Sequence, residues 1–232
     1  MILSGAVGTT VQSVERAFSI LEAFDEQHPA RSASDIAEAT GLARPTTYRM
    51  LQTLRQLGYV RNVSGRFEVT PRVLRLGAGY LGRESIAARS QPSLDRLCEE
   101  LGEHVAIGVL DGDGVIAVAA SSSPQSRMLA IAIQPGQRLP ASATSLGRIL
   151  LAYNGATDSD EAAGIRDAGF VVSDGLLETG LLTMGVPVRD HTGHVVAALS
   201  VAVNSARFTV EELEQQCLPR LRATAIHLSS II

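Results

Sequence analysis

The sequence predicts an α+β protein in which an N-terminal winged helix-turn-helix precedes a mainly antiparallel sheet flanked by helices. Two short helical patterns joined at Gly41, followed by a basic hairpin, predict the first part. Strand-like segments with hairpin turns, lying between helical patterns at 85–101 and 209–228, predict the second. Residues 1–83 hold ten arginines and seven acidic residues, whereas residues 84–232 hold ten and seventeen. This asymmetry favours a nucleic-acid-binding part joined to an acidic domain.

The composition is that of a folded protein, because 45% of the 232 residues are hydrophobic, enough to build packed cores. Cys98 and Cys217 stand singly, without the spacing of a zinc site or the density of a disulfide framework, which favours a reducing cytoplasm. No uncharged run reaches the roughly 18 apolar residues of a membrane helix, and the start has no basic region followed by an apolar core. We therefore expect a cytoplasmic protein with no membrane partner.

Three helices are expected between residues 11 and 57. The first extends from Val11 to about Glu26, and its apolar face contains Val14, Ala17, Phe18, Leu21 and Phe24. Ser32 and Asp35 form a capping box for a second helix that Gly41 ends. A third begins near Arg44 and Pro45 and ends at Leu57, with a core face of Thr47, Met50, Leu51, Leu54 and Leu57.

The opposite face of the third helix has the side chains that read a major groove and its phosphates. It carries Arg44, Thr46, Tyr48, Arg49, Gln52 and Arg55. Beyond it, residues 59–62 and 66–69 flank Val63-Ser64-Gly65 as a hairpin, which places Arg61 and Arg66 to touch the DNA backbone. An arginine-rich helix alone is more often a solvated face. The combination of a capped helix, a glycine turn, a second helix and a basic hairpin predicts binding to double-stranded DNA.

A linker helix is expected over residues 72–83, after Thr70 and Pro71. It contains the pattern Gly77-x-Gly79-x-x-Gly82, which matches the dinucleotide-binding fingerprint but lacks the strand that should precede it. Close helix packing is the favoured interpretation. Two alternatives remain open: an enzyme that binds a nucleotide cofactor through Gly77–Gly82, and an adaptor whose basic stripe meets an acidic protein.

The second half should alternate helices and strands. We expect a helix at 85–101 interrupted at Pro92, and a hairpin of strands 104–110 and 115–120 around Asp111–Gly114. The remaining expected elements are strands at 128–133, 170–172, 182–189 and 194–203, a helix at Ser145–Tyr153, and one closing helix over Thr209–Leu228.

No constellation in this half indicates catalysis. His191 and His194 lie across a turn and not on one helix face, which argues against a metal site. Asp174 and Glu178 have no positioned partner for acid–base work, and no serine has a nucleophile elbow. We expect neither an enzyme nor a cofactor. Small polar residues among apolar strands, Thr144, Ser145, Thr183 and Ser200, suit a small-molecule pocket as well as ordinary strand and cap positions.

Several motifs resemble a known family. SASDIAEATG at 32–41, RPTTYR at 44–49, LRQLGYV at 54–60 and TPRVLRL at 70–76, followed by residues 136–147 and 180–203, resemble IclR-type bacterial transcriptional regulators over residues 11–228. LEAFDEQ, TPRVLRLG and VLDGDGVIAVA are most similar to the branch that regulates protocatechuate, 4-hydroxybenzoate and β-ketoadipate metabolism.

The resemblance implies a winged helix-turn-helix (11–70), a linker helix (71–84) and a GAF-like effector-binding domain (85–232). It also implies homodimers or dimers of dimers that bind palindromic promoter DNA, controlled by a small effector, here an aromatic acid or related carboxylate. The expected DNA-binding residues are Ser32, Arg44, Pro45, Thr46, Tyr48, Arg49, Gln52, Arg61 and Arg66. The expected effector-binding residues are Met128, Ile131, Thr144, Ser145, Leu146, Glu178, Met184, Val186, Pro187, Ser200 and Ala202.

Two departures from the family pattern matter. Ala43 stands where the family usually has a serine N-cap, so the third helix should be less well capped. The connection Asn154–Ala168 is shorter than usual, which puts the helix and loop over the pocket in doubt.

Overall fold

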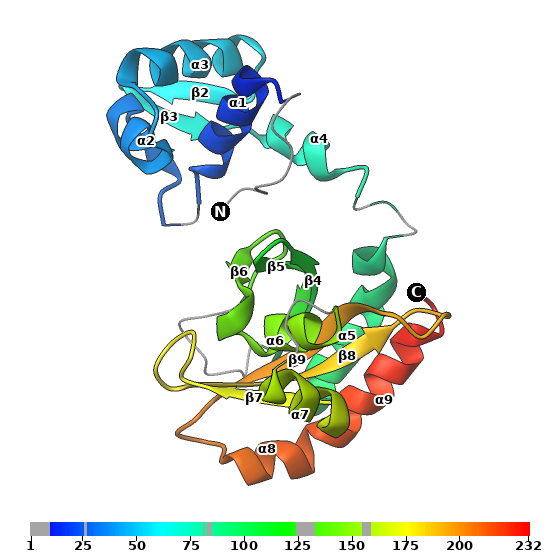
Figure 1. Cartoon of the computed structure of the whole chain (residues 1–232). Helices are drawn as coiled ribbons and strands as arrows, with labels where there is room; N and C mark the ends of the chain where they lie inside the picture. The colour runs from blue at the N-terminus through cyan, green and yellow to red at the C-terminus, as the bar shows by residue number, and fades with distance from the viewer. Residues whose placement is uncertain (1–9, 26, 81, 83–84, 124–132, 155–158) are drawn as a thin grey trace. The chain divides into compact units, whose positions relative to one another are not determined.

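The computed structural model describes residues 10–232 except 26, 81, 83–84, 124–132 and 155–158. The chain divides into two compact units, Met1–Gly82 and Arg83–Ile232. Figure 1 shows the elements of both units along the chain. Each unit has its own core.

The N-terminal unit is a three-helix head with a small sheet. Its helices are α1 (Gln12–Glu22), α2 (Ala33–Thr40) and α3 (Arg44–Gln56). Strands β1 (Ala30–Arg31), β2 (Val60–Val63) and β3 (Arg66–Val69) form an antiparallel sheet in the order β1-β3-β2. A 3-10 turn (Pro71–Val73) and the short helix α4 (Leu74–Gly77) follow. This confirms the predicted winged helix-turn-helix, and β1 adds a third strand that the sequence did not indicate.

The core of this unit differs from the predicted one at several positions. Ile20, Ile36, Leu51, Leu54, Val60 and Phe67 form the buried cluster. α1 ends at Glu22 and not near Glu26, and its fully buried residue is Ile20. Val14, Phe18 and Leu57 were expected to point inward but are about half exposed, at 51%, 49% and 52%. The helical periodicity identified an apolar face, but that face is wider than the part that the core covers.

The C-terminal unit is built on a six-stranded antiparallel sheet in the order β6-β5-β4-β9-β8-β7. Its strands are β4 (His104–Asp111), β5 (Gly114–Ser121), β6 (Arg138–Pro140), β7 (Val171–Asp174), β8 (Leu181–Arg189) and β9 (Val195–Asn204). Its helices are α5 (Ile86–Leu101), α6 (Ser145–Tyr153), α7 (Asp160–Ala168), α8 (Val210–Gln216) and α9 (Leu218–Ser229), with a 3-10 turn at Ala141–Ala143. The predicted α+β arrangement is confirmed.

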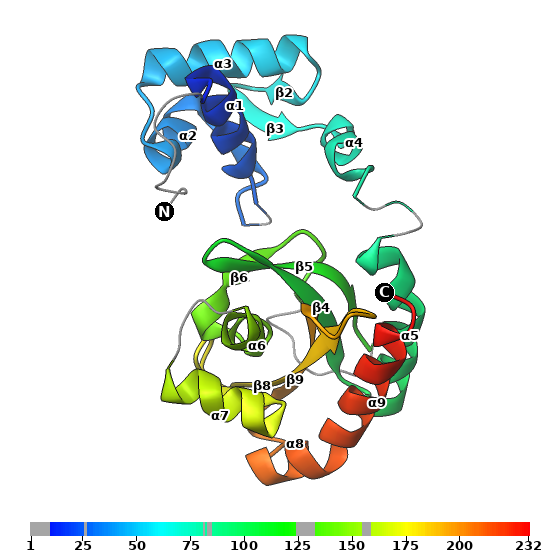
Figure 2. The same ribbon diagram turned by 45° about the vertical axis from the view of Figure 1, so that its right-hand side comes forward.

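The two faces of this sheet are covered by different helices. Figure 2 shows α5 and α9 on one face and α6 and α7 on the other. Leu94 and Leu221 pack with Ile107, Met184 and Leu199 in the cluster beneath α5 and α9. On the other face, a second cluster contains Ala106, Val115, Leu146, Ile149 and Ala198. Alternate residues of each strand therefore belong to different cores.

Several predictions need correction, beginning with the linker helix expected over 72–83, of which α4 forms only Leu74–Gly77 after the 3-10 turn. α5 continues through Pro92 because Ser90, Leu94 and Leu97 are buried on either side of it, and that packing outweighs the missing N–H. The expected closing helix is two helices, which divide at Cys217, with Pro219 in the first turn of α9. α7 was not predicted, and neither was β6. The strand expected over 128–133 lies outside the described residues, except for Ile133, which belongs to no strand.

Candidate nucleic-acid interface and small-molecule pocket

The start of α2 is fixed by the predicted capping box. The Asp35 N–H donates to Ser32 Oγ at 3.2 Å, and the Ser32 N–H donates to Asp35 Oδ2 at 2.9 Å. These hydrogen bonds to Ser32 lower the pKa of the Asp35 carboxyl. Gly41 ends α2 with φ +68, a left-handed conformation that glycine adopts without strain. Local chemistry thus sets both ends of the short helix that precedes α3.

α3 presents a polar face with free side chains. Arg44, Pro45, Tyr48 and Arg49 are exposed, whereas Thr46 and Gln52 are half-buried. Thr47, Leu51 and Leu54 form its buried face. In the described structure, the side chains of Arg44, Tyr48 and Arg49 make no hydrogen bond or ion pair. Unpaired guanidinium groups on an exposed helix face are available to phosphates and to base edges.

The N-terminus of α3 is uncapped, as predicted. Ala43 has the extended conformation of an N-cap (φ −61, ψ 135) but has no side-chain acceptor. The first-turn N–H groups of Arg44 and Thr46 therefore keep their hydrogen-bonding capacity, and such groups at a helix start bind anions well.

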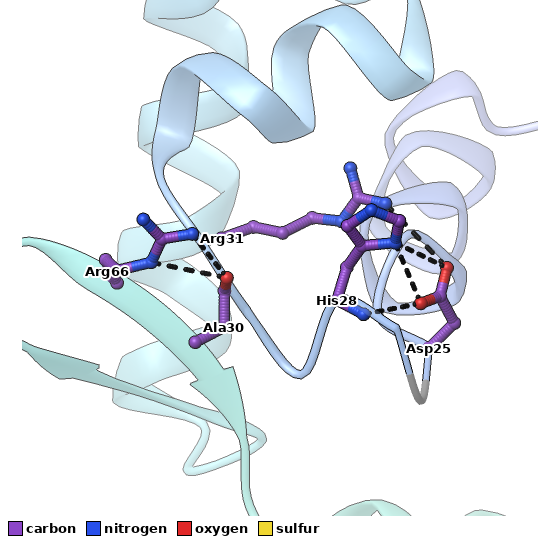
Figure 3. Close-up of polar contacts among 5 residues, drawn as sticks. All are labelled: Asp25, His28, Ala30, Arg31 and Arg66. Carbon is purple, nitrogen blue, oxygen red and sulfur yellow. Dashed lines mark hydrogen bonds and ion pairs between the residues drawn. The ribbon is translucent and has the colours of Figure 1, made fainter.

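The arginines of the wing, which is the hairpin of β2 and β3, differ from those of α3 because their side chains have partners within the unit. Arg61 Nε and Nη2 lie 2.8 and 2.7 Å from Glu68 Oε2. Arg66 donates to the Ala30 carbonyl at 2.8 and 3.3 Å (Figure 3) and lies 3.9 Å from Asp35. Figure 3 also shows Asp25 accepting from the His28 backbone at 2.7 Å, with the side chain of Arg31 directed toward the same carboxylate. Arg66 therefore joins β3 to β1 as well as adding positive charge.

In the C-terminal unit, a cavity of about 10 Å³ lies between the start of α6 and the sheet. Thr144 caps α6 by accepting the Gly147 N–H at 3.0 Å, and Ser145 and Leu146 are buried beside it. Thr183, Ser200 and Ala202 form the floor. The lining is completed by Ile133, Ala143, Leu177 and Leu181. Hydroxyl groups and apolar side chains thus meet at a buried helix N-terminus.

Five of the predicted effector residues line this cavity: Thr144, Ser145, Leu146, Ser200 and Ala202. Pro187 pairs with Ala198 on the same sheet face but does not line the cavity. Met184 and Val186 lie on the opposite face, in the core beneath α5 and α9, so their assignment to this wall was wrong. Glu178 is an exposed loop residue and does not line the cavity either. Met128 and Ile131 lie outside the described residues.

Close approach of backbones positions the start of α6. A Cβ atom on Gly185 would lie 2.8 Å from the Ser145 carbonyl oxygen, and one on Gly147 would lie 2.2 Å from the Ala141 Cα. Both distances are shorter than real Cβ contacts, so these two glycines let α6 pack directly on β8 and on the 3-10 turn. Gly185 also shows which side of β8 faces the cavity, namely the side of Thr183.

α7 covers this region through one arginine of α6. Arg148 donates to Glu161 of α7 at 2.7 and 3.0 Å, to the Val172 carbonyl at 2.6 Å and to Ser173 Oγ at 2.8 Å. One guanidinium thereby joins α6, α7 and β7. The short connection between Asn154 and Ala168 therefore still contains a covering helix. Its sequence signals were Ser159 as N-cap and Gly169 as the left-handed helix end.

Among the described residues, no group of three or more His, Cys, Asp or Glu side chains is placed to hold a metal ion. His194 Nδ1 lies 2.9 Å from Thr192 Oγ1 within its own turn. No helix in the described part of the chain is both long and apolar enough to cross a membrane.

Comparison with known families decides the assignment. Residues 13–64 match the IclR helix-turn-helix domain, and residues 78–164 and 159–230 match the bacterial transcriptional regulator IclR C-terminal domain. The chain belongs to the IclR family. It is a DNA-binding transcriptional regulator, and the family consists of such regulators and not of enzymes, which excludes the alternative of a nucleotide-cofactor enzyme.

Relatives of this IclR-family chain include the Pca regulon regulatory protein of Pseudomonas putida, 33% identical over 92% of this chain and 81% of that protein. The p-hydroxybenzoate hydroxylase transcriptional activator of Acinetobacter baylyi is 30% identical over 96% and 92%. The predicted resemblance to the aromatic-pathway branch is confirmed. An IclR homologue from Microbacterium hydrocarbonoxydans, solved with 4-hydroxybenzoate, shares the fold with TM-score 0.75 and 24% identity, covering 94% of this chain and 98% of the other.

Proposed function

We propose that this protein is a one-component switch in which an aromatic carboxylate controls binding to promoter DNA. Residues 11–70 bind the DNA, 85–232 bind the effector, and 71–84 connect them. The observation that carries the DNA assignment is the exposed face of α3, where Arg44, Tyr48 and Arg49 have no partner within the described structure. A regulator that binds bacterial promoter DNA works in the cytoplasm, which is the compartment that we assign.

We assign different tasks to the DNA-binding residues. Arg49 and Tyr48, on the middle of the exposed face, read base edges together with Arg44, Thr46 and Gln52, because bidentate arginine contacts discriminate bases. The wing residues Arg61 and Arg66, together with Ser32, bind the phosphate backbone and set the register, and Pro45 lies at the same interface without donating a hydrogen bond. Two heads of a homodimer, or of a dimer of dimers, read half-sites of a palindrome about one helical turn apart.

The cavity at the start of α6 suits a carboxylate. Backbone N–H groups at a helix N-terminus attract anions, and the hydroxyls of Ser145, Thr183 and Ser200 surround this end. Leu146, Leu177 and Ile133 supply apolar surface for a ring. The names of two relatives refer to the pca regulon and to p-hydroxybenzoate hydroxylase, and the solved homologue holds 4-hydroxybenzoate. These facts support an aromatic acid as the effector.

The cavity volume implies that effector binding rearranges the domain. About 10 Å³ holds no more than a water molecule, whereas a cavity that accepts a benzene ring measures about 150 Å³. An effector must therefore bind an enlarged state better than the compact one. Such differential affinity shifts the population of states, and it links effector affinity and DNA affinity reciprocally.

The DNA assignment is tested by selecting bound duplexes from a random library and measuring their affinity by fluorescence anisotropy. We expect one enriched palindromic sequence. Arg49→Ala should weaken binding to it about 10- to 100-fold and relax the preference at one base position. Arg55→Ala is the matched control at the far end of α3, and it should lower affinity for all sequences alike. If no sequence is enriched and the protein ignores DNA even at low salt, the proposal fails and an adaptor role is favoured.

A further inference from the structure

A buried histidine in the strand next to the cavity lacks a complete set of hydrogen bonds; it does not line the cavity, but its direct strand partner Ala202 does. His104, the first residue of β4, is 2% exposed. Its Nδ1 lies 2.7 Å from Ser122 Oγ, but its Nε2 is buried and has no partner. The Nε atom of Arg31, in the other unit, is the second such nitrogen among the described residues, but the guanidinium of Arg31 has Asp25 as an ion partner at 3.7 Å. A buried polar atom without a hydrogen-bond partner lowers the stability of the fold, so its presence calls for an explanation, and a functional role is one.

The strand register places this imidazole on the cavity side of the sheet. His104 pairs with Ala202 of β9, Ala202 pairs with Thr183 of β8, and Thr183 pairs with Ser173 of β7. Directly paired residues of antiparallel strands point to the same face, with Cβ atoms about 4.5–5.5 Å apart. Thr183 and Ala202 line the cavity. Ala106 is two residues further along β4 and therefore on the same face as His104. It belongs to the core beneath α6, as Leu146 does, which supports this placement.

Ala202 is the only strand residue between Thr183 and His104 in this row, and its side chain is a single methyl group. Adjacent strands lie about 4.8 Å apart, so the Thr183 and His104 backbones are separated by roughly 10 Å. The cavity beneath the start of α6 is lined by Ala202 and Thr183 of this row, and an aromatic ring would enter there only after the cavity enlarges. A ligand that contacts both the start of α6 and His104 would have to cross the methyl group of Ala202.

The chemistry of the imidazole selects the ligand group. Burial lowers the pKa of His104, so the ring is neutral at pH 7. The Ser122 hydroxyl can donate or accept, which leaves Nε2 as an acceptor or as an N–H donor. A ring hydroxyl of the ligand can match either state, because it also donates and accepts. A carboxylate only accepts hydrogen bonds, so it could pair with Nε2 only when Nε2 carries the proton. It is better placed at the N–H groups of α6.

We propose that His104 is an effector-binding residue whose Nε2 hydrogen-bonds a ring hydroxyl of an aromatic acid, while the carboxylate lies at the start of α6. This inference rests on the proposed function and adds to it that hydroxylated aromatic acids are the preferred class of effector. A site built to hydrogen-bond a hydroxyl rejects the analogue that lacks it, because the buried partner is left unsatisfied.

Isothermal titration calorimetry of the full-length protein with 4-hydroxybenzoate and benzoate tests this role. His104→Asn keeps a polar group near Nδ1 for Ser122 but removes the one at Nε2, whereas His104→Gln places an amide near Nε2. We expect the native protein to bind 4-hydroxybenzoate at least tenfold tighter than benzoate. His104→Asn should abolish this preference by lowering the affinity for 4-hydroxybenzoate at least tenfold, to about that for benzoate, and His104→Gln should retain part of the preference.

Each other outcome contradicts a specific statement. A native protein that binds both acids equally, or a preference that survives His104→Asn, overturns the role of His104 and leaves the proposed effector class standing. If His104→Asn loses affinity for both acids equally, the histidine only supports the fold. Circular dichroism of the variant would check this. A native protein that binds neither acid overturns the effector class itself, and the inference with it, whereas binding to promoter DNA is measured separately.

Discussion

Arg61 and Glu68 face each other across the wing hairpin as direct strand partners, with Arg61 Nη2 2.7 Å from Glu68 Oε2. The pair neutralises the positive charge of one of the wing arginines. Because Arg61 is 65% exposed, the ion pair is weak, on the order of 0.2–1 kcal/mol, and DNA phosphates can compete for it.

Removing the carboxylate should therefore strengthen DNA binding. Glu68→Gln frees Arg61 and deletes a negative charge near the phosphates, so we expect up to about fivefold higher affinity at low salt and a steeper salt dependence. Fluorescence anisotropy at several salt concentrations measures both. Glu38→Gln is the matched control, because it removes the same charge from α2, where the described structure shows no arginine partner. Equal gains in the two variants would mean that net charge alone is responsible.

The missing cap of α3 gives a second prediction. Ala43 already has an N-cap conformation, so Ala43→Ser needs only a hydroxyl to accept a first-turn N–H. We expect the N-terminal unit to gain about 1 kcal/mol of unfolding free energy, measured by hydrogen exchange of the α3 amides. Ser32→Ala is the reverse test, since it removes an existing cap from α2 and should lose a similar amount. Unchanged exchange in Ala43→Ser would show that the hydroxyl does not reach the helix N–H groups.

Much of the DNA-binding head could be predicted because its signals are local. The Ser32–Asp35 box, the turn at Gly41 and the positive φ of Ser64 and Gly65 all act within a few residues. By contrast, β1 has two residues, and its pairing with β3 depends on a distant partner. The exposure of Val14, Phe18 and Leu57 also depends on tertiary packing, because periodicity cannot show how far a core extends.

The effector pocket was predicted only in part for a related reason. The segment from Leu181 to Val188 is largely apolar at both odd and even positions, so alternation does not reveal which residues face α6. The approach of Gly185 to Ser145 decides that face, and a contact between elements forty residues apart leaves no local pattern. His104 was not predicted either, since its place in the row with Thr183 follows from the register of three strands.

Gly147 supplies a third prediction. Alanine there would favour a helix by about 1 kcal/mol, but its Cβ would lie 2.2 Å from the Ala141 Cα. Backbone has to move, so we expect Gly147→Ala to lose roughly 1–3 kcal/mol of stability and to weaken effector binding. Gly164→Ala in α7 is the matched control, because nothing lies within 4 Å of its Cβ, and it should be neutral or stabilising. Thermal unfolding compares the two. A Gly147→Ala variant as stable as Gly164→Ala would contradict the close packing of α6 on the 3-10 turn.

The buried imidazole of His104 makes the stability of the C-terminal unit depend on pH. Its pKa is lower in the folded state than the ordinary value of 6.5, so the unfolded chain binds more protons below that pH. The stabilisation is therefore complete above about pH 6.5, and it is lost as the pH falls toward the folded-state pKa, with a slope of at most about 1.4 kcal/mol per pH unit. Asp113 and Asp190, whose pKa values are lowered from 3.8, act only at more acidic pH. Urea unfolding between about pH 5 and pH 8, followed by circular dichroism, should show this slope in the native protein and a flatter one in His104→Asn, which has no titrating group at this position. If the unfolding free energy depends on pH in the same way in both proteins, the imidazole keeps its proton affinity on folding. His104 could then no longer be taken as neutral because of its burial.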